Sequence, residues 1–500
     1  MQKKILAVII ALIIVTSIGA AAGQVPQASS DARSIVVGLV APVSKSPVGQ
    51  DMYRAAQLAV KEINDAGGVH VADWNTNVNI TLDLADTIDD APGNAVTPVN
   101  RAVTVDNVDL LIGGYGSAGT LANEVVAIEN KVPYIISGAS NQLVTRRGPQ
   151  GNYGGLNSTD SQAITDAEGM SYIFHYCTTT YHYSKTVVDF FATVMKPMVA
   201  PDRNFKLAIL FRDDAFGNGV EQASKYWIEN ESLPITIVSD FKYPTTATDF
   251  QTQLTEIKGN APDAVFVVDN PDRTPTIVKQ GLSDVGLKTV YIAVENNEDP
   301  VFYSLLGQSG ESQLLESKFA PYAGPPYYLP GMEAYVTSFN NTYGVIPGMM
   351  GADTYDAFFI GKAAIESAGT VNKSAVRTAI EQTNLDDMLI ITKTGKIQFS
   401  TGTNYHEIDP VTFIEQLKWD ATTSQLKPAI VWPATVSGVG TIQQSQIALP
   451  TDYPLATPSS TSSDNNQNQD STMTYILVAV AAGIAIVVVV AVFLMKKNKK

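Results

Sequence analysis

Two short runs of small residues have the composition of an anion-binding site. The first, Gly113 to Ser117, follows the apolar stretch 110–112, and the second, Gly138, Ala139 and Ser140, follows 133–136. Glycines permit sharp backbone turns without a side-chain clash, and the serines add hydroxyl groups. Where such turns meet at the carboxyl ends of parallel strands, backbone N–H groups and a helix N-terminus can hold a small anion or carboxylate. We therefore expect these turns to bind a ligand.

A helix and two strands must position these turns. Leu121, Val125 and Ile128 recur at helical spacing after the first turn, which predicts a helix with one face on a sheet. Ser117 or Thr120 is expected to cap its N-terminus. Together with strands at 110–112 and 133–136, this helix forms a strand-turn-helix-strand unit.

The first turn also matches a nucleotide-binding pattern. Gly114, Gly116 and Gly119 satisfy G-x-G-x-x-G between a strand and a helix. However, the next strand is followed by Ser137 and Gly138 instead of the acidic residue that would bind a ribose. A dinucleotide site, a purely structural turn and a small-ligand cradle remain open, and the ligand cradle is favoured.

The sequence between 34 and 294 alternates strands and helices, which predicts two doubly wound parallel sheets. Strands are expected at 34–40, 80–84, 110–112, 133–136, 206–211, 235–241, 264–268 and 290–294. Helices are expected at 51–64, 93–105, 219–230, 249–258 and 274–285. The fold class is therefore α/β.

The two ends of the chain have the composition of export and anchoring segments. Residues 1–22 combine two lysines, an apolar run and small residues, as in a signal peptide. Residues 475–495 are long and apolar enough for a transmembrane helix, and the lysines of 496–500 predict a cytoplasmic tail. Residues 436–474 are predicted to be a linker. The protein is therefore expected at the cell surface, attached to the membrane by its C-terminal helix.

Composition excludes several classes of function. A net charge of −16 argues against nucleic acid as a partner. No motif of a hydrolase, a zinc protease or a P-loop enzyme is present, so we expect no catalytic residue and no cofactor. His175, Cys177 and His182 could be imagined as metal ligands, but a structural role among the neighbouring tyrosines is favoured, and no metal is expected.

Several motifs in order carry a family resemblance. IVVGLVAPVS, GQDMYRAAQLAVKEINDAGGV, NVDLLIGGYGS and VPYIISGAS are followed by KLAILFRDDAFGNGVEQA, APDAVFVVDN and TYDAFFIGKAAIESAG. The chain thus resembles branched-chain amino-acid-binding proteins, the extracellular solute-binding subunits of ABC importers, which have the type I periplasmic-binding fold. The resemblance covers 34–433 and implies two lobes joined by three hinge crossings. It places the first lobe at 34–172 and 320–384, and the second at 173–319 and 385–435.

The resemblance also implies the ligand contacts, all in the cleft between the lobes. The first-lobe turns would hold a ligand carboxylate, and Glu295 would pair with a ligand ammonium. Phe216 and Asn270 are the second-lobe contacts that the resemblance implies, although Asn270 replaces a frequent tyrosine. Tyr176, in the tyrosine-rich segment after the first lobe, is counted as a contact, and a place in the core is the open alternative. The full set of expected ligand contacts is Gly116, Ser117, Gly138, Ala139, Ser140, Tyr176, Phe216, Asn270 and Glu295.

The function implied by the resemblance is solute binding for an ABC permease. An amino acid, branched-chain or other, is the expected ligand, and amides, urea or small carboxylates are alternatives. A sensory ectodomain that acts with a separate receptor is the alternative function.

Overall fold

The computed structural model describes residues 33–149, 163–321, 329, 331–402, 404–436, 440–441 and 447–454. These residues belong to one compact unit that ends at Pro454. The expected signal peptide (1–22), membrane span (475–495) and tail (496–500) lie outside the described residues. Within the described ranges, no helix is long and apolar enough to cross a membrane.

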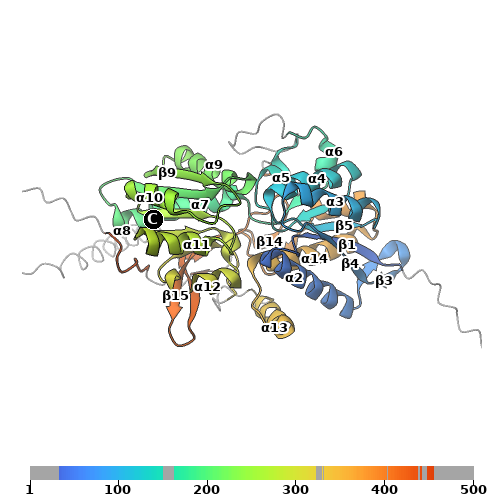
Figure 1. Cartoon of the computed structure of the whole chain (residues 1–500). Helices are drawn as coiled ribbons and strands as arrows, with labels where there is room; N and C mark the ends of the chain where they lie inside the picture. The colour runs from blue at the N-terminus through green and yellow to red at the C-terminus, as the bar shows by residue number, and fades with distance from the viewer. Residues whose placement is uncertain are drawn as a thin grey trace, which may run out of the picture. The chain divides into compact units, whose positions relative to one another are not determined.

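The first sheet has five parallel strands in the order β4-β1-β5-β6-β7, of which Figure 1 labels β4, β1 and β5. The strands are Ile35–Ala41 (β1), Ile80–Asp86 (β4), Leu110–Gly113 (β5), Tyr134–Ile136 (β6) and Ile173–His175 (β7). The helices of this lobe are Pro47–Asp65 (α2), Pro92–Thr104 (α3), Ser117–Asn130 (α4), Leu143–Arg146 (α5), Ala167–Met170 (α6), Met332–Tyr343 (α13), Met349–Ala368 (α14) and Lys373–Glu381 (α15). We call this sheet and its helices the first lobe.

Both faces of the first sheet are buried along β1, β5, β6 and β7, as their nearly continuous apolar sequences require, whereas the edge strand β4 is partly exposed. Successive side chains of a strand point to opposite faces, so Leu110 and Ile112 pack with α2 and α14, whereas Leu111 packs with α3 and α4. Two short hairpins, Val69–Val71 (β2) with Thr76–Val78 (β3) and Leu385–Asp386 (β13) with Lys396–Ile397 (β14), complete the lobe.

The second sheet has seven strands in the order β16-β15-β12-β11-β10-β8-β9. They are Phe205–Arg212 (β8), Ile235–Tyr243 (β9), Ala264–Val268 (β10), Val290–Ala293 (β11), Leu314–Ser317 (β12), Phe413–Asp420 (β15) and Gln425–Trp432 (β16). Its helices are Thr180–Phe190 (α7), Lys196–Val199 (α8), Ala215–Asn230 (α9), Gln251–Gly259 (α10), Thr274–Lys279 (α11) and Pro300–Leu306 (α12). This sheet and its helices form the second lobe. The four strands expected in this sheet are parallel, and β15 and β16, which were not expected, add to it as antiparallel strands.

Two predicted lobe boundaries need correction. Residues 173–175 were expected in the second lobe, but as β7 they pair with β6 of the first sheet. Residues from 385 onward were also expected there, yet Leu389, Ile390 and Ile397 are buried in the first-lobe core. The chain therefore crosses after His175 and again just before Phe413, each time later than expected.

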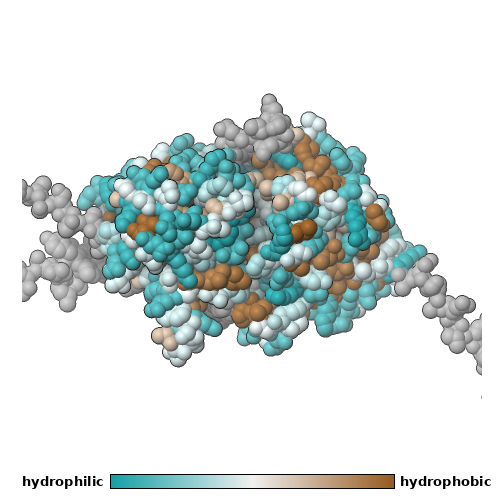
Figure 2. All heavy atoms as spheres, in the orientation of Figure 1, coloured by the Kyte–Doolittle hydropathy of each residue, from teal (hydrophilic) through white to brown (hydrophobic). Residues whose placement is uncertain are grey.

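The predicted start of the linker, at residue 436, is also too early, because residues up to Tyr453 still pack against the second lobe. Ile447, Leu449 and Tyr453 pack against the second-lobe core, and the Tyr453 hydroxyl donates to the carbonyl oxygen of Asp263 at 2.9 Å. These apolar side chains gain burial, which a free linker would not provide. On the face shown in Figure 2, most of the described surface is hydrophilic, with apolar residues scattered between charged ones.

Candidate ligand-binding site

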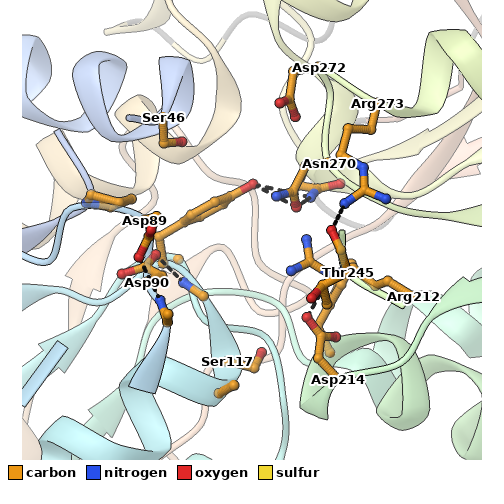
Figure 3. A pocket seen from close by; sticks show the side chains of 18 of the residues that line it. Ser46, Asp89, Asp90, Ser117, Arg212, Asp214, Thr245, Asn270, Asp272 and Arg273 are labelled. Carbon is orange, nitrogen blue, oxygen red and sulfur yellow. Dashed lines mark hydrogen bonds and ion pairs between the residues drawn. The ribbon is translucent and has the colours of Figure 1, made fainter. Parts of the chain in front are cut away.

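A cavity of about 660 Å³ lies between the two lobes. Its lining residues follow the carboxyl ends of strands in both sheets, among them β4, β5 and β6 on one side and β8, β10 and β11 on the other. Figure 3 shows this cavity with side chains from the two lobes on opposite walls. In open parallel sheets this is the edge where ligands bind.

The two small-residue turns meet on the first-lobe wall, as expected. A Cβ atom on Gly138 would lie 2.8 Å from the carbonyl oxygen of Gly114, so only glycine lets the turns approach this closely. Gly116, Ser117, Gly138 and Ser140 all line the cavity. The Ser140 hydroxyl is hydrogen-bonded to the Tyr183 hydroxyl at 3.0 Å.

The prediction that Ser117 or Thr120 caps the N-terminus of helix α4 is wrong. Helix α4 begins at Ser117 itself, after an N-cap at Gly116 that makes no side-chain capping bond. The Ser117 hydroxyl oxygen instead accepts the backbone N–H of Asn141 at 3.2 Å, which ties the two turns together. A serine at the first helical position cannot reach the N–H groups that an N-cap side chain reaches.

The Asp90 carboxylate is hydrogen-bonded to the backbone N–H of Gly116 in the first turn. Its Oδ2 accepts the Gly116 N–H at 2.7 Å, and Oδ1 accepts the Thr87 hydroxyl. A Cβ atom on Gly116 would lie 2.6 Å from the Asp90 Cβ, and one on Gly119 would lie 2.5 Å from the Asp90 carbonyl oxygen. Two of the three glycines that imitate a nucleotide motif, Gly116 and Gly119, therefore make room for Asp90. Burial raises the pKa of Asp90 to about 6.

A polar bridge connects the two walls. The Tyr115 hydroxyl of the first lobe donates to Asn270 Oδ1 at 3.2 Å, and Asn296 Nδ2 donates to the same oxygen at 3.2 Å and to the Tyr115 hydroxyl at 3.3 Å. Asn270 therefore lines the cavity, as expected. Its side-chain oxygen is already hydrogen-bonded to Tyr115 on the opposite wall of the cavity. Phe216 also lines the cavity, half-buried in the first turn of α9.

Arg212, at the end of β8, is a charged group of the second-lobe wall. Its Nε lies 2.6 Å from Asp214 Oδ2, and its Nη1 lies 3.6 Å from Asp269 Oδ1. Asp269 is fully buried and also pairs with Arg273 at 3.2 Å while accepting the Tyr243 hydroxyl at 2.8 Å. Asp269 therefore fixes the position of Arg212 from behind.

Glu295, after β11, lines the cavity with a buried carboxylate. The side chain is 1% exposed, and among the described residues Oε2 has no hydrogen-bond partner. The Cys177 thiol faces Oε1 at 3.6 Å. Burial raises the pKa of Glu295, and the nearby Lys318 ammonium, which pairs with Asp353 at 2.8 Å, opposes that rise. A buried oxygen without a partner is suited to accept a hydrogen bond from a ligand.

Further buried carboxyl groups surround this region without lining the cavity. Burial raises the pKa of Glu298 and of Asp356 to about 7, and that of Asp353 to about 8. Glu124 in α4, beside Arg147, also has a pKa raised to about 7 by burial. These groups gain protons more readily in the folded chain than in the unfolded one.

Two expected contacts do not line the cavity. Tyr176 is buried in the first-lobe core, where its hydroxyl donates to Asp356 Oδ2 at 2.8 Å. Ala139 is also in the core, and its carbonyl oxygen accepts the His175 Nε2–H at 2.6 Å. Ala139 points inward while its neighbours Gly138 and Ser140 line the cavity, and Tyr176 is held in the core by its bond to Asp356.

The histidine and cysteine set does not form a metal site. His182 Nδ1 is bonded to the Thr179 hydroxyl at 2.8 Å, whereas His175 bonds a backbone carbonyl. Burial lowers the pKa of both histidines to about 4. In the part of the chain that the structure describes, no group of three or more His, Cys, Asp or Glu side chains could hold a metal ion.

Sequence reasoning missed most of the residues that line the cavity, and four of them are polar or charged residues whose contacts are described above. Asp90, Tyr115, Arg212 and Asn296 were not expected, although each lies at or just beyond the carboxyl end of a strand. The rule that ligand sites form at these strand ends would have selected them. Nothing in the sequence indicates that Asp90 bends back onto Gly116, because this depends on its left-handed backbone (φ 58°).

The chain was compared with known protein families and proteins. The sequence pattern of the periplasmic binding protein family matches residues 34–418. "Leu/Ile/Val-binding protein homolog 8" of Brucella abortus is 22% identical over 320 residues, which cover 62% of this chain and 70% of that protein.

Solved structures resemble the fold at low sequence identity. The branched-chain amino acid transporter substrate-binding protein of Streptococcus pneumoniae, in complex with isoleucine, matches with a TM-score of 0.62 and 18% identity, covering 80% of this chain and 100% of that one. A solute-binding protein of an ABC transporter from R. palustris, in complex with benzoate, matches with a TM-score of 0.63 and 17% identity, covering 83% and 99%. This likeness establishes the type I periplasmic-binding architecture.

Proposed function

The chain belongs to the periplasmic binding protein family, and on this premise we propose that it is the substrate-binding protein of an ABC importer. It binds a small solute in the cavity between its lobes and delivers that solute to a permease. The matched proteins bear names of solute-binding proteins, which supports this proposal.

The observation that carries the proposal is the Glu295 carboxylate. Glu295 lines the cavity, and its buried Oε2 makes no hydrogen bond among the described residues, while the nearby Lys318 ammonium and Thr178 hydroxyl favour the ionised carboxylate. A desolvated oxygen left in this state is costly unless a ligand supplies the missing donor. An ammonium or another N–H group would do so, which favours an amino acid as the ligand over a simple carboxylate.

The proposed ligand contacts are those expected residues that line the cavity. The first lobe contributes the two small-residue turns. The second lobe contributes the aromatic ring of Phe216, the Asn270 amide and the Glu295 carboxylate. The contacts are Gly116, Ser117, Gly138, Ser140, Phe216, Asn270 and Glu295. Because they come from both lobes, a bound solute would favour the closed arrangement.

We further propose that the protein is held at the cell surface by its C-terminal apolar segment. The apolar run within 475–495 and the lysines after it support this reading. Deletion of 470–500 should release a folded protein into the medium. Retention of the truncated protein in the membrane fraction would contradict the proposed anchor.

A thermal-shift screen tests the binding function. The purified 23–469 segment is mixed with the amino acids, with amides and urea, and with aromatic and aliphatic carboxylates. At least one amino acid should raise the melting temperature by mass action. If only carboxylates without an amino group stabilise the protein, Glu295 does not hold a ligand ammonium.

A further inference from the structure

We propose that the ligand carries a second positive charge at the end of its side chain, as a basic amino acid does. This inference rests on the proposed function and deepens it. The α-carboxylate of the ligand stays at the first-lobe turns and its α-amino group at Glu295, whereas the side chain enters the acidic remainder of the cavity. We call this remainder the side-chain subsite, and it is lined by Asp90, Tyr115, Asn270, Asp272 and Asn296.

The composition of the cavity lining argues against an aliphatic side chain. Among the described residues, no leucine, isoleucine or valine lines the cavity, and its larger apolar groups come from prolines, Tyr115, Phe216 and Met350. Pockets for apolar groups are lined mainly by hydrophobic side chains. A branched aliphatic group would make few such contacts here and would cover polar groups without offering them a hydrogen bond. The side-chain subsite therefore fits a polar group better.

The hydrogen-bonded bridge of Tyr115, Asn270 and Asn296 places polar groups beside Glu295. Asn296 follows Glu295 directly, and Asn270 comes after β10, the strand that pairs with β11. Tyr115 is 7% exposed and Asn296 is 5% exposed, so both are largely withdrawn from water. A ligand whose amino group contacts Glu295 therefore has its side chain next to amide and phenol groups.

The charges of the cavity lining are unequal. Three cations line the cavity, and each is already paired with an aspartate. The ion pairs are Lys45 Nζ with Asp89 Oδ2 at 3.2 Å, Arg212 Nε with Asp214 Oδ2 at 2.6 Å, and Arg273 Nε with Asp269 Oδ2 at 3.2 Å. Six carboxylates line the cavity, and they are Asp89, Asp90, Asp213, Asp214, Asp272 and Glu295. Negative charge is therefore in excess.

Cations outside the lining do not remove this excess. Lys242 pairs with Asp213 at 3.2 Å, which accounts for one of the remaining acids. The Lys318 ammonium, which favours the ionised form of Glu295, has its own partner in Asp353 at 2.8 Å. Asp90 and Asp272 are left without a cationic partner in the part of the chain that the structure describes.

These two acids lie where a ligand cation can meet them. Asp272 is exposed, and within the described ranges its carboxylate makes neither a hydrogen bond nor an ion pair. Asp90 has neutral partners, the Gly116 N–H and the Thr87 hydroxyl. Figure 3 shows Asp272 beside Asn270 on the second-lobe wall, with Asp90 on the opposite wall. A cationic group in the cavity therefore has an acid without a cationic partner on either side.

The excess of acid favours a cationic solute over a neutral one. A cleft lined by charges of one sign concentrates solutes of the opposite charge. The α-amino and α-carboxylate groups of an amino acid cancel, so a neutral side chain leaves the excess unchanged, whereas an ammonium or guanidinium reduces it. Closure of the lobes would remove water from these acids and strengthen the preference.

Calorimetry with two matched pairs of probes tests this inference. L-lysine and L-norleucine share a carbon chain and differ by the terminal amine, and L-arginine and L-citrulline have similar shapes but differ in charge. L-leucine is the aliphatic reference. The variants are Asp272→Asn and Asp90→Asn, each of which removes one charge and keeps an oxygen acceptor. Asp202→Asn is the matched control, because Asp202 is also exposed and without a hydrogen bond or ion pair in the described ranges but does not line the cavity.

The better-bound cationic probe should bind the wild type about tenfold or more tightly than its neutral counterpart and than L-leucine. Asp272→Asn should reduce that preference by roughly threefold to tenfold, as expected for an ion pair that the ligand partly desolvates. Asp90→Asn should reduce it as well, and Asp202→Asn should leave it unchanged. The preference should also shrink as salt is raised, because salt screens the exposed Asp272 carboxylate.

Contrary results separate this inference from the proposed function. If L-norleucine, L-citrulline or L-leucine binds the wild type as tightly as the cationic probes, the cationic side chain is refuted and amino-acid binding stands. A preference that is the same in the wild type and in both cavity variants overturns the assignment to Asp90 and Asp272. If no probe binds but another amino acid stabilises the protein in the thermal-shift screen, this inference alone is refuted. If no amino acid does so, the proposed amino-acid ligand fails as well.

Discussion

Replacement of Glu295 by glutamine separates ligand binding from folding. The substitution keeps the size of the side chain and removes its charge. In the structure Glu295 is 1% exposed, lines the cavity and has one oxygen without a partner among the described residues. Burial raises its pKa, which means that the ionised form is held at a cost to the folded chain.

The two effects of Glu295→Gln should have different signs. Without ligand, and above about pH 8, where Asp353 is ionised and pairs with Lys318, the free energy of unfolding should stay the same or rise, because a buried charge is removed. With ligand, an ammonium would be buried without its counter-charge, which costs roughly 2–5 kcal/mol of binding, or about thirty-fold or more in affinity.

The assay combines calorimetric binding with denaturant unfolding in the absence of ligand. Glu298→Gln is the matched control, because Glu298 is equally buried but accepts the Tyr303 hydroxyl at 2.6 Å and does not line the cavity. It should leave affinity unchanged. Our reasoning is refuted if Glu295→Gln binds an amino-acid ligand as tightly as the wild type, or if both variants lose affinity equally.

Three further predictions concern the scaffold. Arg146→Met should lower the free energy of unfolding by about 3–5 kcal/mol in urea titrations, because it leaves the buried Glu407 carboxylate, 2.6 Å from Arg146 Nε, without its charge partner; an unchanged midpoint would contradict this. Gly138→Ala should weaken ligand binding measured by calorimetry, since its Cβ would press on the carbonyl oxygen of Gly114 from 2.8 Å and part the two turns; wild-type affinity would contradict that close packing. The melting temperature should rise as pH falls from about 8 to about 6.5, because Asp353 and the other buried acids, with pKa values of about 7 and 8, take up protons in the folded chain before the unfolded chain does. Below that window, protonation of His175 and His182 in the unfolded chain opposes the gain, and a melting temperature that falls between pH 8 and 6.5 would refute the assignment.

Much of the fold was predictable because local signals determine it. Apolar runs give the strands, as at Ala264–Val268, where the expected and observed bounds agree. Glycines and the periodicity of apolar residues likewise indicated α2 and α4. The β15–β16 hairpin was not foreseen, because β15 joins the sheet by pairing with β12, about a hundred residues earlier, which no local pattern records.

The site divides in the same way. Gly116 and Ser117 were found because small residues after a strand have a local meaning. Tyr176 was counted as a ligand contact because it follows a strand. Its hydroxyl instead donates to Asp356 in the core, a contact between residues far apart in the sequence that no local pattern indicates. Asp90 was missed because an aspartate in a loop gives no sign of a left-handed backbone that directs it onto another turn.

The most direct test of the account is mass spectrometry of the small molecules released when the purified protein is denatured. We expect one small amino-carboxylic acid, present at close to one molecule per chain in protein purified without dialysis against denaturant. The same molecule, added back to ligand-free protein, should bind in calorimetry and lose affinity with Glu295→Gln. A released solute with no amino group, or one whose rebinding is insensitive to Glu295, would contradict the central claim.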